Sequence, residues 1–257
     1  MSKKNKFSRA KNKTDNRLLI REDLTADDGS YMKDGIKHKI KELKWTPRQI
    51  EFIKLALDPK VKIIFVNGPA GTSKTLLAVY CGLRMLNDCT LSELMYIRSA
   101  VESSDSRLGY LPGSADEKLQ FYNLPFLDKL VELTSNEQTL RLEKEKKVSM
   151  FPVNFSRGLN WCNKCVIFDE AQNSSAKEIT TVLTRLGRNS KCFILADPMQ
   201  TDLNKHCSGF EGMYSLFSDE DSKANGVYAF QFTEEDVMRS DLVKFLVRKM
   251  KKLNVKA

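Results

Sequence analysis

Short apolar runs alternate with stretches of helical periodicity along most of this chain. The apolar runs predict strands at residues 62–66, 94–98, 165–168, 192–196 and 228–232. Helical patterns lie between them, near residues 75–86, 175–186 and 209–217. Nearly all-apolar strands separated by helices indicate a mostly parallel sheet covered by helices on both faces. The pattern therefore predicts an α/β fold.

The ordered pattern begins at the segment TPRQIEFIKLALD, after a stretch of different composition. Thr46 can cap a helix there, and Pro47 suits the first helical position. Residues 1–44 carry many charges and few apolar side chains. We therefore expect a flexible basic arm and linker at 1–44, followed by one domain at 45–257.

Polar residues directly follow three of the predicted strands. The segment GPAGTSKT comes after Val66, the pair DE comes after Phe168, and Asp197 comes after Ala196. Carboxyl ends of parallel strands meet at one edge of the sheet, where open α/β sheets bind ligands. We expect these three segments to form a single site.

The segment GPAGTSKT resembles the phosphate-binding loop G-x-x-x-x-G-K-[ST]. In such a loop, backbone N–H groups and the start of the next helix hold the phosphates. Lys74 would reach the β- and γ-phosphates, and the Thr75 hydroxyl would ligate Mg²⁺. The residues assigned to nucleotide binding are Gly68, Pro69, Ala70, Gly71, Thr72, Ser73, Lys74 and Thr75.

Ser73 departs from the loop pattern, which has glycine at this position. If the backbone there is left-handed, a side chain costs roughly 1–2 kcal/mol. Micromolar binding is worth about 8 kcal/mol, so the substitution would weaken the site without abolishing it. The sequence still predicts a loop that binds a nucleoside triphosphate.

The other two segments supply the groups for hydrolysis. In CVIFDEAQN, Asp169 would hold Mg²⁺ and Glu170 would orient and deprotonate a water molecule. Alternatively, the two carboxylates cap the helix that follows. In FILADPMQTD, Gln200 is placed to contact the γ-phosphate or the water, or it belongs to an ordinary surface loop. No N-K-x-D motif for guanine is present, which favours ATP over GTP.

The formal net charge of +9 suggests a polyanionic partner. Basic residues are concentrated near the N-terminus and in the final segment VRKMKKLNVKA, where Thr233 and Asp236 would cap a last helix reaching about Lys252. Solvated tails explain such clusters equally well. The segment MFPVNFSRGLNW interleaves arginine with aromatic residues, which suits stacking on single-stranded RNA or DNA or, alternatively, packing in the core.

Cysteines and hydropathy limit the other functions. Six cysteines are scattered, and those in apolar runs fit reduced core residues. Cys162 and Cys165 with His206 and Cys207 would be an incomplete zinc motif. No apolar run is long enough to span a membrane, and the basic N-terminus lacks the apolar stretch of a secretory signal. We expect a cytoplasmic protein with no membrane partner.

The ordered set of motifs resembles the PhoH-like ATPases, which are similar to the first motor domain of superfamily 1 helicases. The motifs are GPAGTSKT, SRLGYLPGSADEK, FSRGLNW, VIFDEAQN, LTRLG and DPMQTD, within residues 45–250. The resemblance implies a RecA-like P-loop NTPase fold, ATP and Mg²⁺ as ligands, and helicase-like work on RNA. The nuclease domain of longer relatives has no counterpart in this sequence, so the resemblance implies no ribonuclease activity.

The resemblance also assigns residues that the pattern alone does not. It implies that Gln49 contacts adenine, that Gln200 senses the γ-phosphate, and that Arg239 or Arg185 acts on a neighbouring subunit's nucleotide. Three residues depart from the family pattern: Ser73 and Ala196, each in place of glycine, and Ser99, in place of proline.

A single motor domain lacks the second domain that supplies an arginine in helicases. We therefore expect a homo-oligomer, a hexameric ring, with nucleotide at the subunit interfaces. Three alternatives remain: a nucleotide-gated binding module that does not turn over, a small-molecule or nucleoside kinase, and a nuclease. A kinase needs an acceptor pocket and a lid, and the DEAQN segment followed by the glutamine loop fits hydrolysis better. A nuclease needs a compact cluster of acidic metal ligands, and the sequence shows none outside the ATP site.

Overall fold

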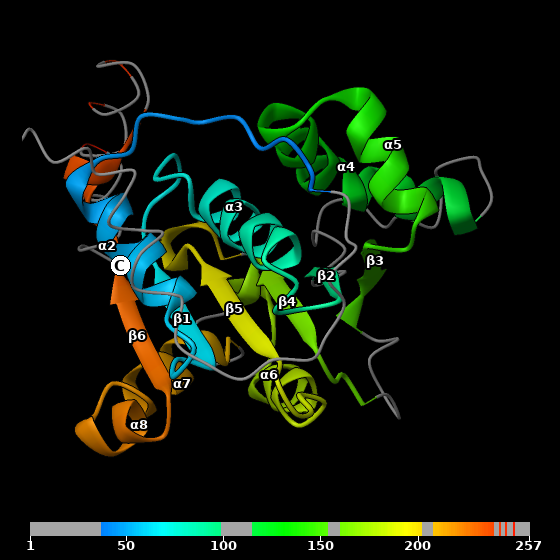
Figure 1. Ribbon diagram of the computed structural model, residues 1–257. Coiled ribbons are helices and arrows are strands. Elements are labelled where there is room, and N and C mark those ends of the chain that lie inside the picture. The colour runs from blue at the N-terminus through cyan, green and yellow to red at the C-terminus, as the bar shows by residue number, and fades with distance from the viewer. Residues whose placement is uncertain are drawn as a thin grey trace, which may run out of the picture. The chain divides into compact units, whose positions relative to one another are not determined.

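The computed structural model describes residues 37–98, 115–153, 160–201 and 208–238, together with Leu242, Phe245 and Lys249 in a C-terminal helix; the side chains of 115–122 are excepted. Six strands form one sheet in the order β3-β2-β4-β5-β1-β6, and every neighbouring pair is parallel. The strands are β1 Ile63–Asn67, β2 Glu93–Arg98, β3 Val148–Pro152, β4 Lys164–Asp169, β5 Lys191–Ala196 and β6 Val227–Gln231. The predicted parallel α/β fold is confirmed (Figure 1).

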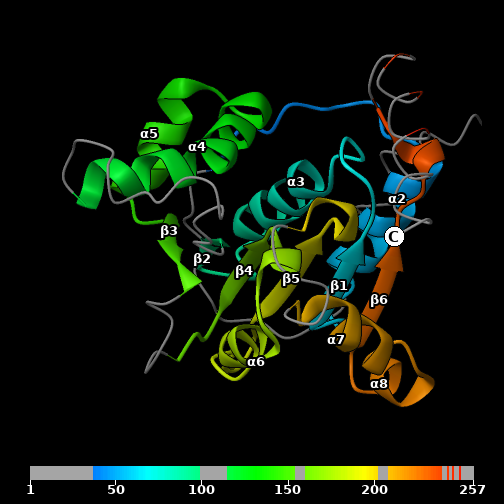
Figure 2. The ribbon, with the colours of Figure 1, turned by 180° about the vertical axis from the view of Figure 1, so that it is seen from behind.

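Helices cover both faces of this sheet, as Figures 1 and 2 show from opposite sides. One face carries α2, α3 and α4, and the other carries α6 and α7. The helices are α2 Pro47–Leu57, α3 Lys74–Asn87, α4 Ala115–Leu133, α5 Asn136–Lys144, α6 Ala176–Leu183, α7 Phe210–Leu216 and α8 Glu220–Ala224. Within the described part of the chain, no helix is long and apolar enough to cross a membrane.

The core explains why the central strands read as unbroken apolar runs. All six residues of β5 are buried, and so are five of the six in β4. A cluster of buried side chains joins Phe65 of β1, Phe168 of β4 and Ile194 of β5 to the inner sides of α6 and α7. Because both faces of these strands are covered, neither face needs polar residues.

Strand order fixes where the loops after the strands meet. β5 lies between β1 and β4, with Phe65 opposite Ile194 and Ile167 opposite Phe193. All three strands run in the same direction, so their carboxyl ends share one edge of the sheet. The loop after β5 therefore lies between the loops that follow β1 and β4.

The first helix begins as its sequence predicts. The Thr46 hydroxyl accepts a hydrogen bond from Gln49 N, and Gln49 Oε1 accepts one from Thr46 N, which completes a capping box. Pro47 occupies the first turn. Residues 37–44, which we expected in the arm, cross from α3 to α4: His38 and Asn87 exchange two hydrogen bonds, and Lys41 N donates to Leu133 O at 2.7 Å. Residues 1–36 lie outside the described residues.

Two parts of the pattern were misread or missed. Thr233 and Asp236 do form a capping box, but the turn that it caps is a short 3₁₀ helix, Glu234–Asp236, and Val237 is extended. The prediction that the last helix starts there is wrong; Leu242, Phe245 and Lys249 are the helical positions described. The sequence pattern also did not predict β3, α4, α5 and α8. Pro125 interrupts the helical pattern of α4, and the mixed polarity of β3 weakens its strand pattern.

Candidate functional site

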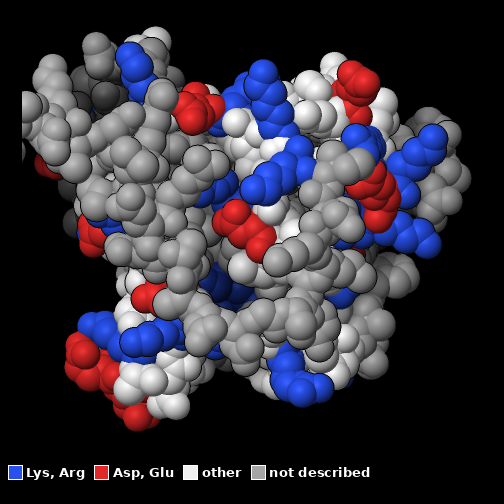
Figure 3. Space-filling model, in the orientation of Figure 1, with Lys and Arg blue, Asp and Glu red and all other residues white. Residues whose placement is uncertain are grey.

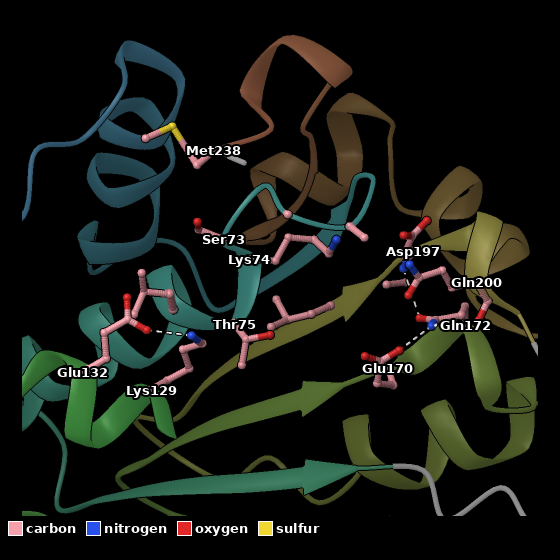
Figure 4. Close-up of a pocket in the computed structure, with 15 residues that line it drawn as sticks. Ser73, Lys74, Thr75, Lys129, Glu132, Glu170, Gln172, Asp197, Gln200 and Met238 are labelled. Atoms are coloured by element: carbon pink, nitrogen blue, oxygen red, sulfur yellow. Dashed lines mark hydrogen bonds and ion pairs between the residues drawn. The ribbon is translucent and has the colours of Figure 1, made fainter. Parts of the chain in front are cut away.

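A cavity of about 360 Å³ opens at the carboxyl edge of the sheet. The loop after β1 contributes to it, as do the segments after β4 and β5 and one turn of α4. In Figure 4, Lys74, Glu170, Asp197 and Gln200 lie at one end, Lys129 and Glu132 at the other, and Thr75 between them. The lining residues are Ala70, Gly71, Ser73, Lys74, Thr75, Leu76, Lys129, Glu132, Glu170, Gln172, Leu195, Ala196, Asp197, Gln200 and Met238.

The backbone of the loop after β1 is bent by two left-handed residues. Gly71 has φ 86°, and Ser73 has φ 64° and ψ 26°. Ser73 therefore adopts the left-handed conformation for which the loop pattern uses glycine. The backbone strain that the sequence predicts for this substitution is present. Met238 N donates to Gly71 O at 2.9 Å, which ties the bend to the chain beyond β6.

Gly68 is required here for space. A Cβ atom at this position would lie 2.7 Å from Phe232 Cβ and 3.3 Å from Phe232 O. Thr72 is fully buried, and its hydroxyl donates to Pro69 O at 2.9 Å. The loop is thus held by its own backbone and by the segment after β6, and α3 begins immediately after it.

The amine of Lys74 is a positive charge beside the loop that would bind the phosphates. Its Nζ donates to Gly68 O at 2.6 Å and to Pro69 O at 3.0 Å. Burial lowers the pKa of this amine, and the nearby carboxylates of Asp197 and Asp169 act in the opposite direction. A charged amine that donates to these two carbonyl oxygens is well placed to exchange those contacts for phosphate oxygens.

Thr75 and Asp169 form a pair of hard oxygen donors. The Thr75 hydroxyl donates to Asp169 Oδ2 at 2.9 Å, and Tyr96 OH donates to the same oxygen at 2.9 Å. Burial, followed by the charge of Asp169, raises the pKa of Tyr96 well above its ordinary value, so the phenol stays a donor. Mg²⁺ usually binds one or two protein oxygens together with phosphates and water, and this pair fits that requirement.

Glu170 has a strained backbone and a perturbed carboxyl group. Its φ of 55° and ψ of 37° are left-handed, which is costly for a residue with a side chain. Burial raises the pKa of this carboxyl, as does the adjacent charge of Asp169. Arg98 Nη2 lies 3.9 Å from Glu170 Oε1. A carboxylate whose pKa is raised is a stronger base than an ordinary glutamate, which suits it to accept a proton from water.

Gln172 connects Glu170 to the loop after β5. Its Nε2 donates to Glu170 Oε2 at 2.5 Å and to Gln200 O at 3.3 Å, while its Oε1 accepts from Asp197 N at 3.0 Å. Asp197 caps the short turn Pro198–Gln200, with Oδ1 accepting from Met199 N at 3.1 Å. One buried amide therefore fixes both loops. Figure 4 shows it between Glu170 and Asp197.

The structure brings together most of the predicted residues. Lys74, Thr75, Glu170 and Gln200 line one cavity, and Asp169 bonds to Thr75 beneath it. The alternative helix-cap role for Asp169 and Glu170 is not observed, because Ser175 caps α6 in a capping box with Glu178. Gln49 does not line the cavity; it is 1% exposed and part of the α2 capping box.

Of the two predicted arginines, the structure describes Arg185. Arg185 follows α6, and its carbonyl accepts a hydrogen bond from Trp161 N, just before β4. It therefore lies at the amino-terminal edge of the sheet, opposite the cavity, and cannot reach the cavity of its own subunit. Arg239 lies outside the described residues, although its sequence neighbour Met238 lines the cavity.

The aromatic segment predicted for stacking is partly core. Trp161 is 3% exposed and belongs to the central hydrophobic cluster, with its ring 6.2 Å from that of Phe151. Trp161 cannot stack on bases from this position, so of the two alternatives for this residue the structure supports packing in the core. Phe155 and Arg157 lie outside the described residues.

Three cysteines are reduced core residues, as the apolar runs around them predict. Cys81, Cys165 and Cys192 are buried, and burial raises the pKa of the Cys81 thiol to about 12. His206 and Cys207 lie outside the described residues. Among those that are described, no group of three His, Cys, Asp or Glu side chains is placed to hold a metal ion.

Several site residues were not found from the sequence. Gln172 lies in the DEAQN motif and Asp197 directly follows β5, but the sequence pattern predicts no function for either residue. Tyr96 and Arg98 reach the site only because β2 pairs with β4, with Arg98 opposite Asp169. No spacing in the sequence signals that pairing. Lys129 and Glu132 lie on a helix that the pattern did not reveal.

The sheet order, the phosphate-type loop and the paired carboxylates define a P-loop NTPase domain. Residues 17–251 match the family model described as PhoH-like protein. This chain belongs to the PhoH-like family.

Individual relatives agree with the family match. A PhoH-like protein of Synechocystis sp. is 35% identical over 203 residues, which cover 79% of this chain and 60% of that protein. Protein PhoH of Escherichia coli is 32% identical over 197 residues, covering 76% and 54%. The chain thus spans between half and two thirds of the length of these relatives.

Among solved structures, the large terminase of a thermophilic bacteriophage matches with a TM-score of 0.47 at 11% identity. The match covers 80% of this chain and 50% of that one. A likeness of this degree says nothing about function.

Proposed function

We propose that this protein binds ATP with Mg²⁺ and hydrolyses it. The observation that carries the proposal is the convergence of Lys74, Thr75, Glu170 and Gln200 on one cavity, with Asp169 bonded to Thr75. These residues come from the ends of three parallel strands. A cation, a pair of hard oxygen donors and a carboxyl with a raised pKa are the groups that phosphoryl transfer to water needs.

Each residue has a defined task in this proposal. The N–H groups of the loop and Lys74 bind the β- and γ-phosphates. Thr75 and Asp169 would hold Mg²⁺, which when bound neutralises charge on the phosphate oxygens. Glu170 orients a water molecule and accepts its proton. Gln200 lies at the same end of the cavity and would contact the γ-phosphate, with Gln172 holding both segments in place.

One group that fast hydrolysis usually requires is not found among the described residues that line the cavity. Among the described lining residues, the cations are Lys74 and Lys129, and no arginine is present. An arginine supplied by a neighbouring subunit contributes about 10³–10⁵ to the rate in related chemistry. We therefore propose a ring of subunits, a hexamer, in which Arg185 or Arg239 completes the neighbour's site. Arg185 is on the opposite edge of the sheet, as a group that serves another subunit would be.

We also propose RNA or single-stranded DNA as the partner on which ATP turnover acts. The support is the net charge of +9 and the family membership. On the face in Figure 3, Lys and Arg side chains are interspersed with Asp and Glu. Ion pairs of the described residues include Lys129–Glu132 and Arg141–Glu145. The described surface of this face therefore offers no single unbroken basic patch, and the basic chain ends are the better candidates.

Phosphate release with added single-stranded RNA tests this coupling. We expect stimulation at low salt that declines as salt rises, because phosphate contacts release counterions. A variant with the basic residues of 1–17 changed to glutamine serves as a control for the N-terminal cluster, and it should retain basal release. Absence of stimulation at any salt would exclude nucleic acid as the partner and favour a different substrate for the motor.

A further inference from the structure

Helix α4 is part of the nucleotide site as well as a cover for the sheet. Lys129 and Glu132 on α4 line the cavity, and their side chains pair at 2.6 Å. One turn earlier, Phe126 stacks on Tyr96 of β2, with ring centroids 4.8 Å apart and an interplanar angle of 12°. Both rings are essentially fully buried. Helix α4 thus contributes two residues to the cavity and packs a third against Tyr96.

The Tyr96 hydroxyl contacts the carboxylate of Asp169, which would bind the metal in the proposed mechanism. It donates to Asp169 Oδ2 at 2.9 Å. The same oxygen accepts from Thr75 Oγ1 at 2.9 Å, and the other carboxylate oxygen, Oδ1, accepts from Glu170 N at 3.0 Å. Two of these three donors belong to the nucleotide machinery itself. Tyr96 is the donor that approaches from within the sheet.

Strand register explains how this contact arises. In the parallel pair, Tyr96 lies opposite Ile167, two residues before Asp169. Residues two apart on a strand point to the same face, so Asp169 and Ile167 share the face toward which Tyr96 projects. A tyrosine is long enough to reach the diagonal neighbour, and Phe126 packs against its ring. The hydroxyl is therefore held in one place by the core.

We propose that Tyr96 is a positioning residue for the metal-binding carboxylate of Asp169, and that Phe126 of α4 fixes it in that role. The inference rests on the proposed function of the site. A carboxylate that ligates a metal, or a metal-bound water, must keep one orientation while the phosphates enter and leave. Outer hydrogen bonds of this kind orient the ligands of metal sites, and their removal usually costs about 10- to 100-fold in metal affinity.

Two effects of removing the hydroxyl oppose each other. Without its donor, Asp169 keeps more negative charge, which favours a cation. However, the buried carboxylate also loses the hydrogen bond that fixes its orientation, which weakens its binding of a metal ion or a metal-bound water. We expect the second effect to dominate, because Asp169 is only 6% exposed and water is poorly placed to replace the phenol.

The test compares Tyr96→Phe with the native protein and with Tyr228→Phe. Tyr228 lies on β6, opposite Ile64 of β1, and β6 is the edge strand at the other end of the sheet from β2 and β3. Its substitution by phenylalanine also removes one hydroxyl and serves as the matched control. A fluorescent, non-hydrolysable ATP analogue is titrated without metal and at increasing concentrations of MgCl₂. For Tyr96→Phe we expect the half-saturating Mg²⁺ concentration to rise about 10-fold, with metal-free binding of the analogue unchanged. Tyr228→Phe should match the native protein in both measurements.

Each outcome has a distinct meaning. If the native protein shows no Mg²⁺-dependent binding, the proposed function fails and this inference fails with it. If the native protein does show it and Tyr96→Phe has the same Mg²⁺ dependence, only the inference is overturned. Equal weakening of metal-free binding would mean a general structural role and would also overturn it. Should Tyr96→Phe not fold, Phe126→Leu keeps the hydroxyl but loosens the ring, and it must shift the Mg²⁺ dependence in the same direction.

Discussion

At the scale of single residues, two of the six described non-glycine residues with a positive φ lie where the chemistry is expected. Ser73 and Glu170 both have left-handed backbones although neither is glycine. Such conformations cost about 1–3 kcal/mol each and persist only where the surroundings enforce them. Here the loop after β1 and the Gln172 hydrogen bonds supply that constraint.

The raised pKa of Glu170 leads to a prediction on pH. As a base, Glu170 must be ionised, so phosphate release should fall as pH drops through a pKa above that of an ordinary glutamate. Glu170→Gln should lose most of the rate and this pH dependence. A profile between about pH 5 and 8 measures the effect. Glu211→Gln, at an exposed position of α7, is the matched control and should keep the native profile.

The same substitution makes a prediction for stability. A raised folded-state pKa means that the folded protein holds this proton more tightly than the unfolded chain does. The associated stability is present at low pH and is lost as pH rises through the folded pKa. At neutral pH the ionised carboxylate therefore destabilises the fold, and Glu170→Gln should melt at a higher temperature than the native protein. A lower melting temperature would show that Glu170 is mainly a structural residue.

Residue types in a motif could be predicted, but their supporting contacts could not. Lys74, Thr75, Asp169 and Glu170 were assigned correctly to one place because their spacing from apolar strands is visible in the sequence. Tyr96 was not, because its contact with Asp169 depends on the pairing of β2 with β4 across 73 positions of the chain. Local pattern carries no information on that pairing.

At the scale of elements, buried strands and capped helices were predictable, and the region between β2 and β4 was not. β1, β4 and β5 are apolar on both faces, which leaves a clear signal. β3 is an edge strand with mostly half-buried residues, so its signal is weak. α4 contains Pro125 and is held to the sheet partly by the Phe126–Tyr96 contact, which propensity does not reveal.

Helix α7 offers a matched pair of glycines. A Cβ at Gly209 would lie 2.1 Å from Ala176 N and 2.3 Å from its Cα, whereas a Cβ at Gly212 would meet nothing within 4 Å. Gly209→Ala should lower the free energy of unfolding by about 1–3 kcal/mol, through forced movement of α6. Gly212→Ala should raise it by about 1 kcal/mol, because alanine is the better helix former.

Urea denaturation of the two glycine variants measures both effects. Gly209→Ala being as stable as the native protein would contradict the close packing between the start of α7 and the start of α6. Gly212→Ala being destabilised would contradict the open surface around that position.

At the scale of the whole molecule, the proposed ring follows from the missing arginine among the described residues that line the cavity. Light scattering should give a mass that is a multiple of the 29.4 kDa chain, with ATP favouring assembly. A complementation experiment then tests the arginine. Lys74→Ala has a defective nucleotide site but intact arginines, and Arg185→Ala has the reverse.

Mixing the two inactive variants should restore part of the activity if Arg185 serves a neighbour, and the same mixture with Arg239→Ala tests the other candidate. A monomer of 29.4 kDa with full phosphate release would contradict the ring. Recovery with neither arginine variant would exclude both residues from this role.

The most direct measurement is phosphate release from ATP by the native protein, Lys74→Ala and Glu170→Gln, assayed in parallel with Mg²⁺. We expect steady release by the native protein and background release by both variants. We also expect that Glu170→Gln still retains ATP in a binding assay while Lys74→Ala does not. Release by Lys74→Ala at the native rate, or none by a native protein that also fails to retain ATP, would contradict the assignment of this cavity.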